Sequence, residues 1–168
     1  MFAKHDMNVT LVERNKLVYL CLKSGHDIAL KEHGLKDFAS RITVVHDEAL
    51  EYMKKIQEQD NLAQEELPHV VFVEPAFRPH LKKLNFSFKK HQSHHYHGYY
   101  EDVEFVLRNE VGQTTLEEVE KLVKAGQQFA LHKVVLALPK RKPRPQLDGY
   151  VCTYRDKFMA YHVYKAAS

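Results

Sequence analysis

Acidic residues stand at the ends of three short apolar runs that are typical of β-strands. Glu13 ends the run 8–13, Asp47 and Glu48 follow the run 41–46, and Glu74 ends the run 69–74. Ligands of open parallel sheets bind beyond the carboxyl ends of the strands. Ionised carboxylates in that position accept hydrogen bonds from hydroxyl or amine groups. Glu13 therefore suits the two hydroxyls of a ribose, and Asp47 with Glu48 suits the amine of an adenine.

These acids also have a purely structural interpretation. Anions are favourable near helix N-termini, so Glu13 would cap the helix that follows the first run. Asp47 would likewise be the N-cap of a helix over 47–57. The residue types alone leave both interpretations open.

The segment 74–79, E-P-A-F-R-P, combines an acid, prolines and an aromatic residue at the end of an apolar run. A base amine is a poor nucleophile because its lone pair is delocalised into the ring. An acceptor side chain and a backbone carbonyl can hold its two hydrogens, while an aromatic ring stacks on the base with about 1–3 kcal/mol. We therefore take Glu74, Pro75 and Phe77 as candidate catalytic residues. The structural alternative is a strand that ends at a proline beside a buried phenylalanine.

Basic and aromatic residues concentrate in two segments that break the rhythm of strands and helices. The segment 80–112 is polar and rich in histidine and tyrosine, and 139–147 holds three prolines, which predicts a stiff extended loop. Lysine and arginine here suit contacts with RNA phosphates, and a solvated surface is the alternative. The candidate RNA-binding residues are Lys82, Lys83, Lys89, Lys90, Lys140, Arg141, Lys142 and Arg144.

Four histidines lie close together in the first of these segments: His91, His94, His95 and His97. Zinc would need three of them, but no cysteine is near and the spacing matches no standard zinc finger. Histidine-rich loops are usually solvated, so we expect no metal here. The neighbouring tyrosines, Tyr96, Tyr99 and Tyr100, would equally well stack on RNA bases.

The apolar runs alternate with helical patterns, which predicts a doubly wound α/β sheet in a single domain, residues 1–168, with an insertion at about 80–112. The expected strands are 8–13, 41–46, 69–74, 133–138 and a hairpin of 150–154 with 157–164. The runs 69–74 and 133–138 are apolar almost throughout, as strands buried on both faces are. The expected helices are 16–31, 47–57 and 115–124, the last starting with a capping box of Thr115 and Glu118.

Composition adds broad limits. Apolar residues make up 44% of the 168, which favours a globular chain, and the net charge of +3 is mild. Cys21 and Cys152 lie in apolar stretches, so we expect buried free thiols and a reducing, cytoplasmic location. We see no secretory signal and no apolar run long enough to span a membrane.

In their order along the chain, these motifs resemble the ribosomal RNA small subunit methyltransferase J family. That family methylates the exocyclic N2 of a guanine in small-subunit rRNA with S-adenosylmethionine. Residues 11–15 (L-V-E-R-N) are similar to its L-E-R-N segment, which implies that Glu13 and Arg14 line the cofactor site. Residues 42–49 are similar to its L-I-H-A-S-S segment, which adds Asp47, Glu48 and Ala49. Residues 70–80 are similar to its V-V-Y-L-D-P-M-F-P-H, which places Glu74 at both cofactor and base.

The resemblance continues through residues 133–147 and the closing hairpin. It implies a Rossmann-like, S-adenosylmethionine-dependent methyltransferase sheet, mostly parallel with a C-terminal antiparallel hairpin. It also implies the small ribosomal subunit as partner and direct methyl transfer to the guanine amine. Glu74 stands where the family has aspartate, and Glu48 and Ala49 stand where it has two serines.

The family's D-A-T-A-G-L-G-R-D segment, which forms its first, central strand and a glycine-rich turn, has no counterpart in this sequence. That strand lies between the equivalents of 8–13 and 69–74. We therefore expect these two strands to pair directly, or to flank a strand from an upstream segment or a partner chain. Two other functions stay open: a catalytically inactive module that binds RNA or protein, and a degenerate receiver domain.

Overall fold

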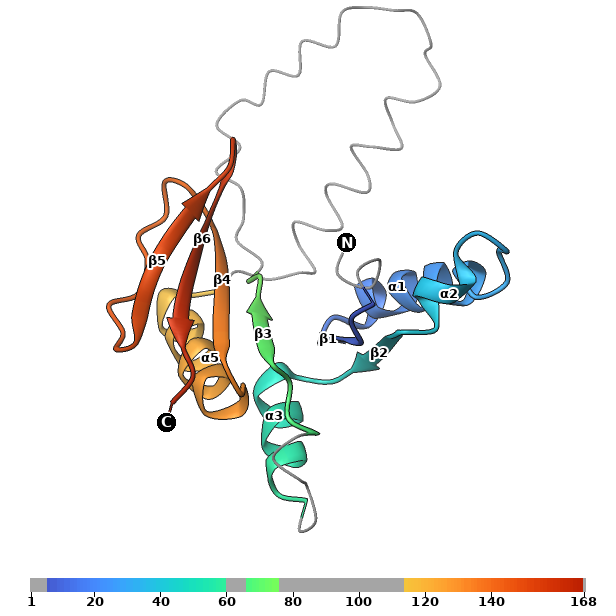
Figure 1. Ribbon diagram of the computed structural model, residues 1–168, viewed down its shortest axis with the longest axis horizontal. Helices are drawn as coiled ribbons and strands as arrows, with labels where there is room; N and C mark the ends of the chain where they lie inside the picture. Colours follow the sequence, from blue (N-terminus) through green and yellow to red (C-terminus); the bar gives the residue numbers. More distant parts are fainter. Residues whose placement is uncertain (1–5, 60–65, 76–113, 168) are drawn as a thin grey trace, which may run out of the picture.

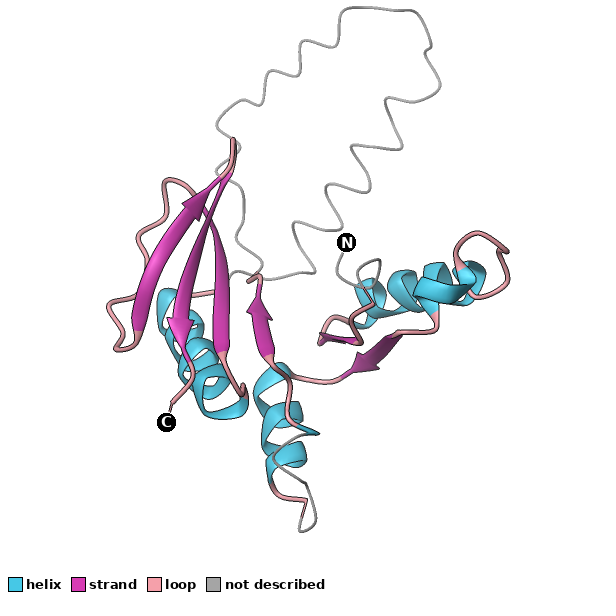
Figure 2. Cartoon of the chain, viewed as in Figure 1, coloured by secondary structure: helices cyan, strands magenta, loops and turns pink. Residues whose placement is uncertain are grey.

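The computed structural model describes residues 6–59, 66–75 and 114–167. Strands and helices alternate along the chain, which confirms the expected α/β class (Figures 1 and 2). The first half contains β1 (Val9–Glu13), α1 (Lys16–Ala29), α2 (Lys36–Ala39), β2 (Ile42–His46) and α3 (Ala49–Gln57). The second half contains β3 (Val70–Val73), α5 (Leu116–Phe129), β4 (Lys133–Pro139), β5 (Tyr150–Arg155) and β6 (Met159–Lys165).

The strands form two sheets among the described residues, where the sequence led us to expect one. β1 and β2 pair in parallel, with Val9 beside Ile42 and Glu13 beside His46. The second sheet has the order β3-β4-β6-β5, in which β3 and β4 are parallel and the other two pairings are antiparallel. The predicted C-terminal hairpin is therefore confirmed. Direct pairing of the strands 8–13 and 69–74 is not found, because no hydrogen-bonded ladder joins β1 to β3.

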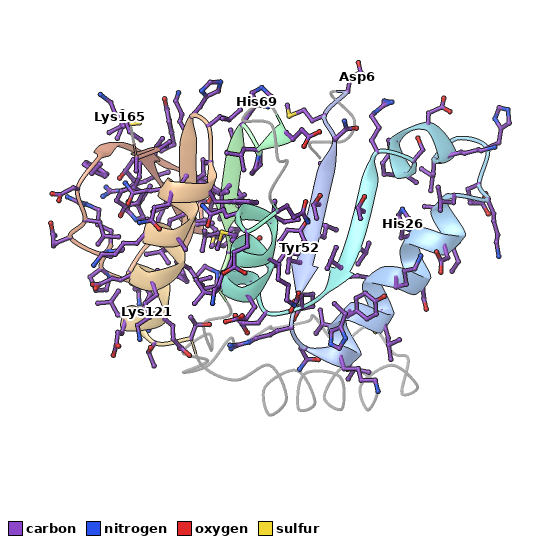
Figure 3. All side chains as sticks on the ribbon, turned by 90° about the horizontal axis from the view of Figure 1, so that it is seen from below. Asp6, His26, Tyr52, His69, Lys121 and Lys165 are labelled. Carbon is purple, nitrogen blue, oxygen red and sulfur yellow. The ribbon has the colours of Figure 1, made fainter. Side chains whose placement is uncertain are left out.

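Each parallel pair of strands is joined by a helix that packs on it. α1 connects β1 and β2 and packs mainly against β2. α5 connects β3 and β4 and packs against both. α3 leads from the first sheet to the second, packs against α5 and also contacts β1. Figure 3 shows α3 and α5 side by side, with α1 apart from them.

The core lies between α5 and the second sheet. Val119 and Val123 of α5 are fully buried against Val134 and Leu136 of β4, and Tyr164 of β6 joins the same cluster. Such side chains each contribute roughly 1.5–3 kcal/mol when they leave water completely. Gly126 lets the helix approach closely, since a Cβ there would lie 3.2 Å from side-chain atoms of both Val71 and Val134. Burial of β4 on both faces is confirmed.

Two expectations about burial are wrong. β3 is covered on one face only: Val71 and Val73 pack against the α5 core, but Val70 and Phe72 are 50% and 38% exposed. Cys21 is exposed and Cys152 only half-buried, although both cysteines are free as expected. The apolar stripe of α1 that carries Cys21 is open to solvent, and no residue of this helix is buried. The shared reason is that no helix of the described residues covers β3 opposite α5 or lies on the outer face of α1. The exposed members of that stripe are Leu17, Leu20 and Ile28.

In the part of the chain that the structure describes, no helix combines the length and apolarity that a membrane span requires.

Candidate ligand site at the carboxyl edge of the strands

The acidic residues singled out in the sequence lie at one edge of the molecule. β1 and β2 are in register to their last residues, so Glu13 and His46 end side by side. Figure 3 shows Asp6, before β1, and His69, before β3, at the same edge of the molecule, with β1 drawn between β2 and β3. Between β1 and β3 the order of strands along the chain reverses. In doubly wound sheets this reversal marks the crevice in which ligands bind.

Glu13 is held by the backbone that follows it. Its Oε1 accepts a hydrogen bond from the backbone N of Asn15 at 2.6 Å. The N-cap of α1 is Asn15, whose side-chain oxygen accepts from the backbone N of Leu17 and Val18 at 3.0 and 3.1 Å. Glu13 is not the N-cap residue itself, but its carboxylate bonds to the backbone N of the N-cap, so the structural interpretation of an anion at the helix N-terminus is confirmed in part. Glu13 is only half-buried, and its carboxylate can accept further hydrogen bonds at the sheet edge.

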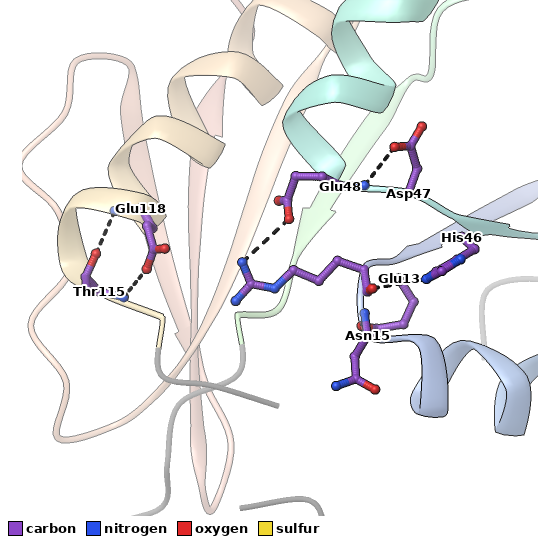
Figure 4. Close-up of polar contacts among 8 residues, drawn as sticks. Glu13, Asn15, His46, Asp47, Glu48, Thr115 and Glu118 are labelled. Atoms are coloured by element: carbon purple, nitrogen blue, oxygen red, sulfur yellow. Dashed lines mark hydrogen bonds and ion pairs between the residues drawn. The ribbon is translucent and has the colours of Figure 1, made fainter. Parts of the chain in front are cut away.

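An ion pair joins the ends of β1 and β2. Arg14 Nη1 lies 3.5 Å from Glu48 Oε2, with both side chains more than 40% exposed (Figure 4). His46 also contacts the residue after β1: its Nε2 lies 3.2 Å from the backbone O of Arg14. The His46 ring stacks on the ring of Tyr19, with 4.8 Å between the ring centroids. An exposed pair of this kind is worth only about 0–1 kcal/mol. Its effect is to orient two charged groups that the sequence assigned to cofactor binding.

Asp47 has a different role from the one predicted. Helix α3 begins at Ala49 with Glu48 as N-cap, and Glu48 makes no side-chain capping bond. Asp47 accepts from the backbone N of Glu48 at 2.9 Å and binds Lys55 Nζ at 2.6 Å. The hydrogen bond from Lys55 holds the pKa of Asp47 below its ordinary value. The predicted N-cap is thus displaced by one residue, and Lys55, about two helical turns further on, holds the acid. The half-buried Ala49 starts the helix.

Glu74 and Pro75 follow β3, on the other side of the reversal from Glu13. Glu74 is exposed and Pro75 half-buried, while Phe77 lies outside the described residues. Tyr161 of β6 faces this position: its ring centroid lies 6.5 Å from that of Phe72. The hydrogen bond to Asp156 raises the pKa of Tyr161, and the nearby carboxylate of Glu74 adds to the effect.

The N-terminus of α5 reaches the same edge. Thr115 and Glu118 form the predicted capping box, with bonds of 2.6 Å and 3.2 Å, which confirms that expectation. Bonds from Thr115 hold the pKa of Glu118 below its ordinary value, and the charge of Arg14 contributes. Figure 4 shows the side chains of Glu48 and Glu118 at the N-terminal ends of α3 and α5. Sequence reasoning assigned Glu118 to capping alone, and only the fold brings it near Arg14.

The basic loop after β4 separates into exposed and anchored residues. Lys140 and Arg141 are exposed, and Lys142 is half-buried, its backbone N donating to Pro139 O at 2.8 Å. Arg144 is packed over the ring of Tyr150 at 3.8 Å and donates to the buried Pro145 carbonyl. The predicted RNA-binding residues Lys82, Lys83, Lys89 and Lys90 lie outside the described residues, as do the histidine and tyrosine cluster of 91–100.

Comparison with known proteins supports the fold. No family model and no curated protein sequence matches the chain. Among solved structures, a SAM-dependent methyltransferase from Neisseria gonorrhoeae is similar with a TM-score of 0.66 and 19% identity, over 98% of this chain and 55% of that one. Two further matches have lower TM-scores. They are a protein of Haemophilus influenzae provisionally described as a methylase (0.41, 16% identity, 96% of this chain, 73% of that one) and one of Escherichia coli provisionally described as a methyltransferase (0.39, 17%, 94% and 61%).

This chain therefore spans about half the length of the Neisseria protein. At 19% identity the likeness is one of fold, and it covers nearly all of this chain. The described residues have the fold of the corresponding part of a SAM-dependent methyltransferase.

Proposed function

We propose that this chain belongs to an S-adenosylmethionine-dependent methyltransferase that acts on the exocyclic N2 amine of a guanine in small-subunit rRNA. The observation that carries the proposal is that Glu13 ends β1 and Glu74 directly follows β3, in a fold like that of the Neisseria methyltransferase. Resemblance to the methyltransferase J family in the segments 11–15, 42–49 and 70–80 supports the more specific substrate.

We further propose that the two sheets are parts of one Rossmann-like sheet, with room for a parallel strand between β1 and β3. β1 and β3 lie in different sheets and no ladder joins them. Their outward apolar side chains support the idea, because Leu11, Val70 and Phe72 are exposed next to the position. A helix following that strand would cover these residues and the open stripe of α1. An additional segment or partner chain would supply both.

The residues present fit one side of the cofactor. Glu13 has a carboxylate aimed at the edge, suited to ribose hydroxyls, and Glu48 with Arg14 provides polar groups beside it. None of the four described glycines directly follows a strand, so the described residues offer no glycine-rich turn for the methionine part. The cofactor would supply a methyl group on a sulfonium. Glu74 would accept hydrogen bonds from the guanine amine and orient it, with the carbonyl near Pro75.

The second candidate is a catalytically inactive methyltransferase-like module that binds RNA or a protein partner. Two features favour it. Glu74 stands where the family has the shorter aspartate. In addition, no strand of the described residues pairs with both β1 and β3, where the family has its central strand. Titration calorimetry of the folded chain with S-adenosylmethionine separates the candidates. The matched variant Glu13→Gln keeps an oxygen that can accept from Asn15, so it leaves the local fold intact.

An enzyme should bind the cofactor, and Glu13→Gln should weaken binding about tenfold or more, since hydrogen bonds to charged groups are worth about 1.5–3 kcal/mol. No heat of binding from the folded chain, with RNA binding retained, would refute cofactor use by this chain and favour the inactive module.

A further inference from the structure

The β5–β6 hairpin presents two unusually exposed aromatic side chains, Tyr154 near the end of β5 and Phe158 in the turn. Phe158 is 70% exposed and Tyr154 is 66% exposed, more than any other large apolar side chain of the described residues. Exposed aromatic rings are unfavourable in water, and contiguous exposed apolar surface marks interaction sites. Neither residue belongs to the sites considered above.

This turn is rigid because one carboxylate organises it. Asp156 accepts hydrogen bonds from the backbone N of Phe158 and of Met159, both at 2.7 Å. Its second oxygen accepts from the Tyr161 hydroxyl at 2.9 Å. With its oxygens engaged in the turn, Asp156 fixes the backbone from which Phe158 projects. A preorganised aromatic ring loses little conformational entropy when a flat ligand stacks on it.

Positive side chains surround the rings. Lys157 Nζ lies 5.3 Å from the centre of the Phe158 ring, and Arg155 on the adjoining strand is exposed. The backbone N of Lys140 donates to the carbonyl of Phe158 at 3.2 Å, which ties the start of the basic loop to the turn. Lys140 and Arg141 are exposed there. The hairpin therefore combines two exposed aromatic rings with several cations, and Asp156, the carboxylate of its turn, is engaged internally.

The turn lies at the same edge as Glu74. β4 runs parallel to β3 and ends at Pro139, which pairs with Met159 at the start of β6. Residues 156–158 therefore follow the carboxyl-terminal direction of β3 and β4, and in Figure 1 the tip of the β5–β6 hairpin extends well beyond the tip of β3. Tyr161 connects the two places, since it bonds to Asp156 and stacks obliquely near Phe72, two residues before Glu74.

We propose that the β5–β6 turn is a stacking platform for unpaired bases of a nucleic acid strand, with Tyr154 and Phe158 contacting bases and Lys157, Lys140 and Arg141 contacting phosphates. Aromatic faces beside a basic track are the combination that single-strand binders use. The proposal rests on the proposed function in one respect: the strand bound here would be the one whose target base reaches Glu74.

Fluorescence anisotropy with a labelled oligoadenylate of about 12 nucleotides tests the platform, because single-strand sites cover about 4–16 nucleotides. RNA and DNA forms of the probe distinguish the two sources of single strands. For each of Tyr154→Ala and Phe158→Ala we expect Kd to rise about 5-fold to 100-fold, at unchanged salt dependence. For Lys157→Gln we expect the slope of log K against log salt to fall by about 0.7.

Two matched controls should leave Kd unchanged. Ile28→Ala removes an apolar side chain that is 61% exposed on α1, and Lys124→Gln removes an exposed lysine of α5 near the opposite edge. Neither aromatic substitution removes a group that bonds to Asp156, so the turn stays folded. Wild-type Kd for both Tyr154→Ala and Phe158→Ala, an equal loss in Ile28→Ala, or no binding of either probe at low salt would each overturn the platform. Calorimetry with the cofactor is independent of all these outcomes, so failure of the platform and failure of the enzyme proposal remain distinct.

Discussion

The first prediction concerns how the two sheets unfold. Leu136, in the middle of β4, is fully buried in the core beneath α5. Replacing such a leucine with alanine costs about 2–5 kcal/mol, from lost burial and the cavity left behind. By contrast, Ala39 is the only fully buried residue in the described range 6–46. The unit of β1, α1 and β2 therefore has little core of its own.

Amide hydrogen exchange reports the free energy of the opening that exposes each amide. In Leu136→Ala, amides of β4 and β6 should exchange about 30-fold to several thousand-fold faster, since about 1.4 kcal/mol corresponds to tenfold. Amides of β1 and β2 should exchange fast already in the wild type and change by less than about twofold. Their opening is local and does not involve the α5 core.

The control is Leu20→Ala on the open stripe of α1, where the leucine is 48% exposed. It should leave the exchange of β4 and β6 unchanged. Equal acceleration of β1 and β4 amides in Leu136→Ala would show a single cooperative unit. That result would refute the view that the two sheets are energetically separate in this chain.

Three further predictions concern local features. Thr115→Ala should lower the free energy of unfolding by about 0.5–2 kcal/mol in a urea titration, because it removes a helix cap; no change would contradict that role. Gly149→Ala should destabilise by about 1 kcal/mol or more, since Gly149 has a φ of +76° and a Cβ would lie 2.8 Å from Gln127 Nε2; thermal unfolding measures it, and an unchanged Tm would refute it. Backbone bonds from Met159 and Phe158 hold the pKa of Asp156 down, so the turn's stabilisation should be complete above about pH 3.9 and lost as pH falls through the lower folded pKa. Amide NMR shifts of Phe158 should titrate below that value, and a midpoint above it would contradict the assignment.

Local patterns predicted the elements well because their causes are local. The capping box of Thr115 and Glu118 needs only a spacing of three residues, and it is present. The apolar run 133–138 predicted a strand buried on both faces, and β4 is one. Asp47 shows the limit of such local prediction. Whether Asp47 or Glu48 is the N-cap of α3 depends on the bond that Asp47 makes with Lys55, further along the helix.

Burial could not be predicted with the same success because it depends on what lies across from a residue. The apolar residues of α1, Leu17, Leu20 and Ile28, recur at helical spacing. Such spacing identifies a face that would be buried if another element packed on it, but it does not show that such an element is present. Cys21 and Phe72 are exposed for this reason. Arg144 gives the converse case. Its charge predicted a contact with phosphate, whereas in the structure its guanidinium packs over the ring of Tyr150, the first residue of β5.

Sheet completion and cofactor binding are coupled in the proposed arrangement. A parallel strand between β1 and β3 would end at the same edge as Glu13 and Glu74, so its following turn would stand between these two acids. A ligand that contacts both that turn and Glu13 binds the completed sheet more tightly than the open one. By linkage, the ligand must then strengthen the association of the strand by the same factor. In the proposed arrangement, the exposed apolar residues of β3 and α1 and the one-sided acidic site would thus have one cause, the unfilled strand position between β1 and β3.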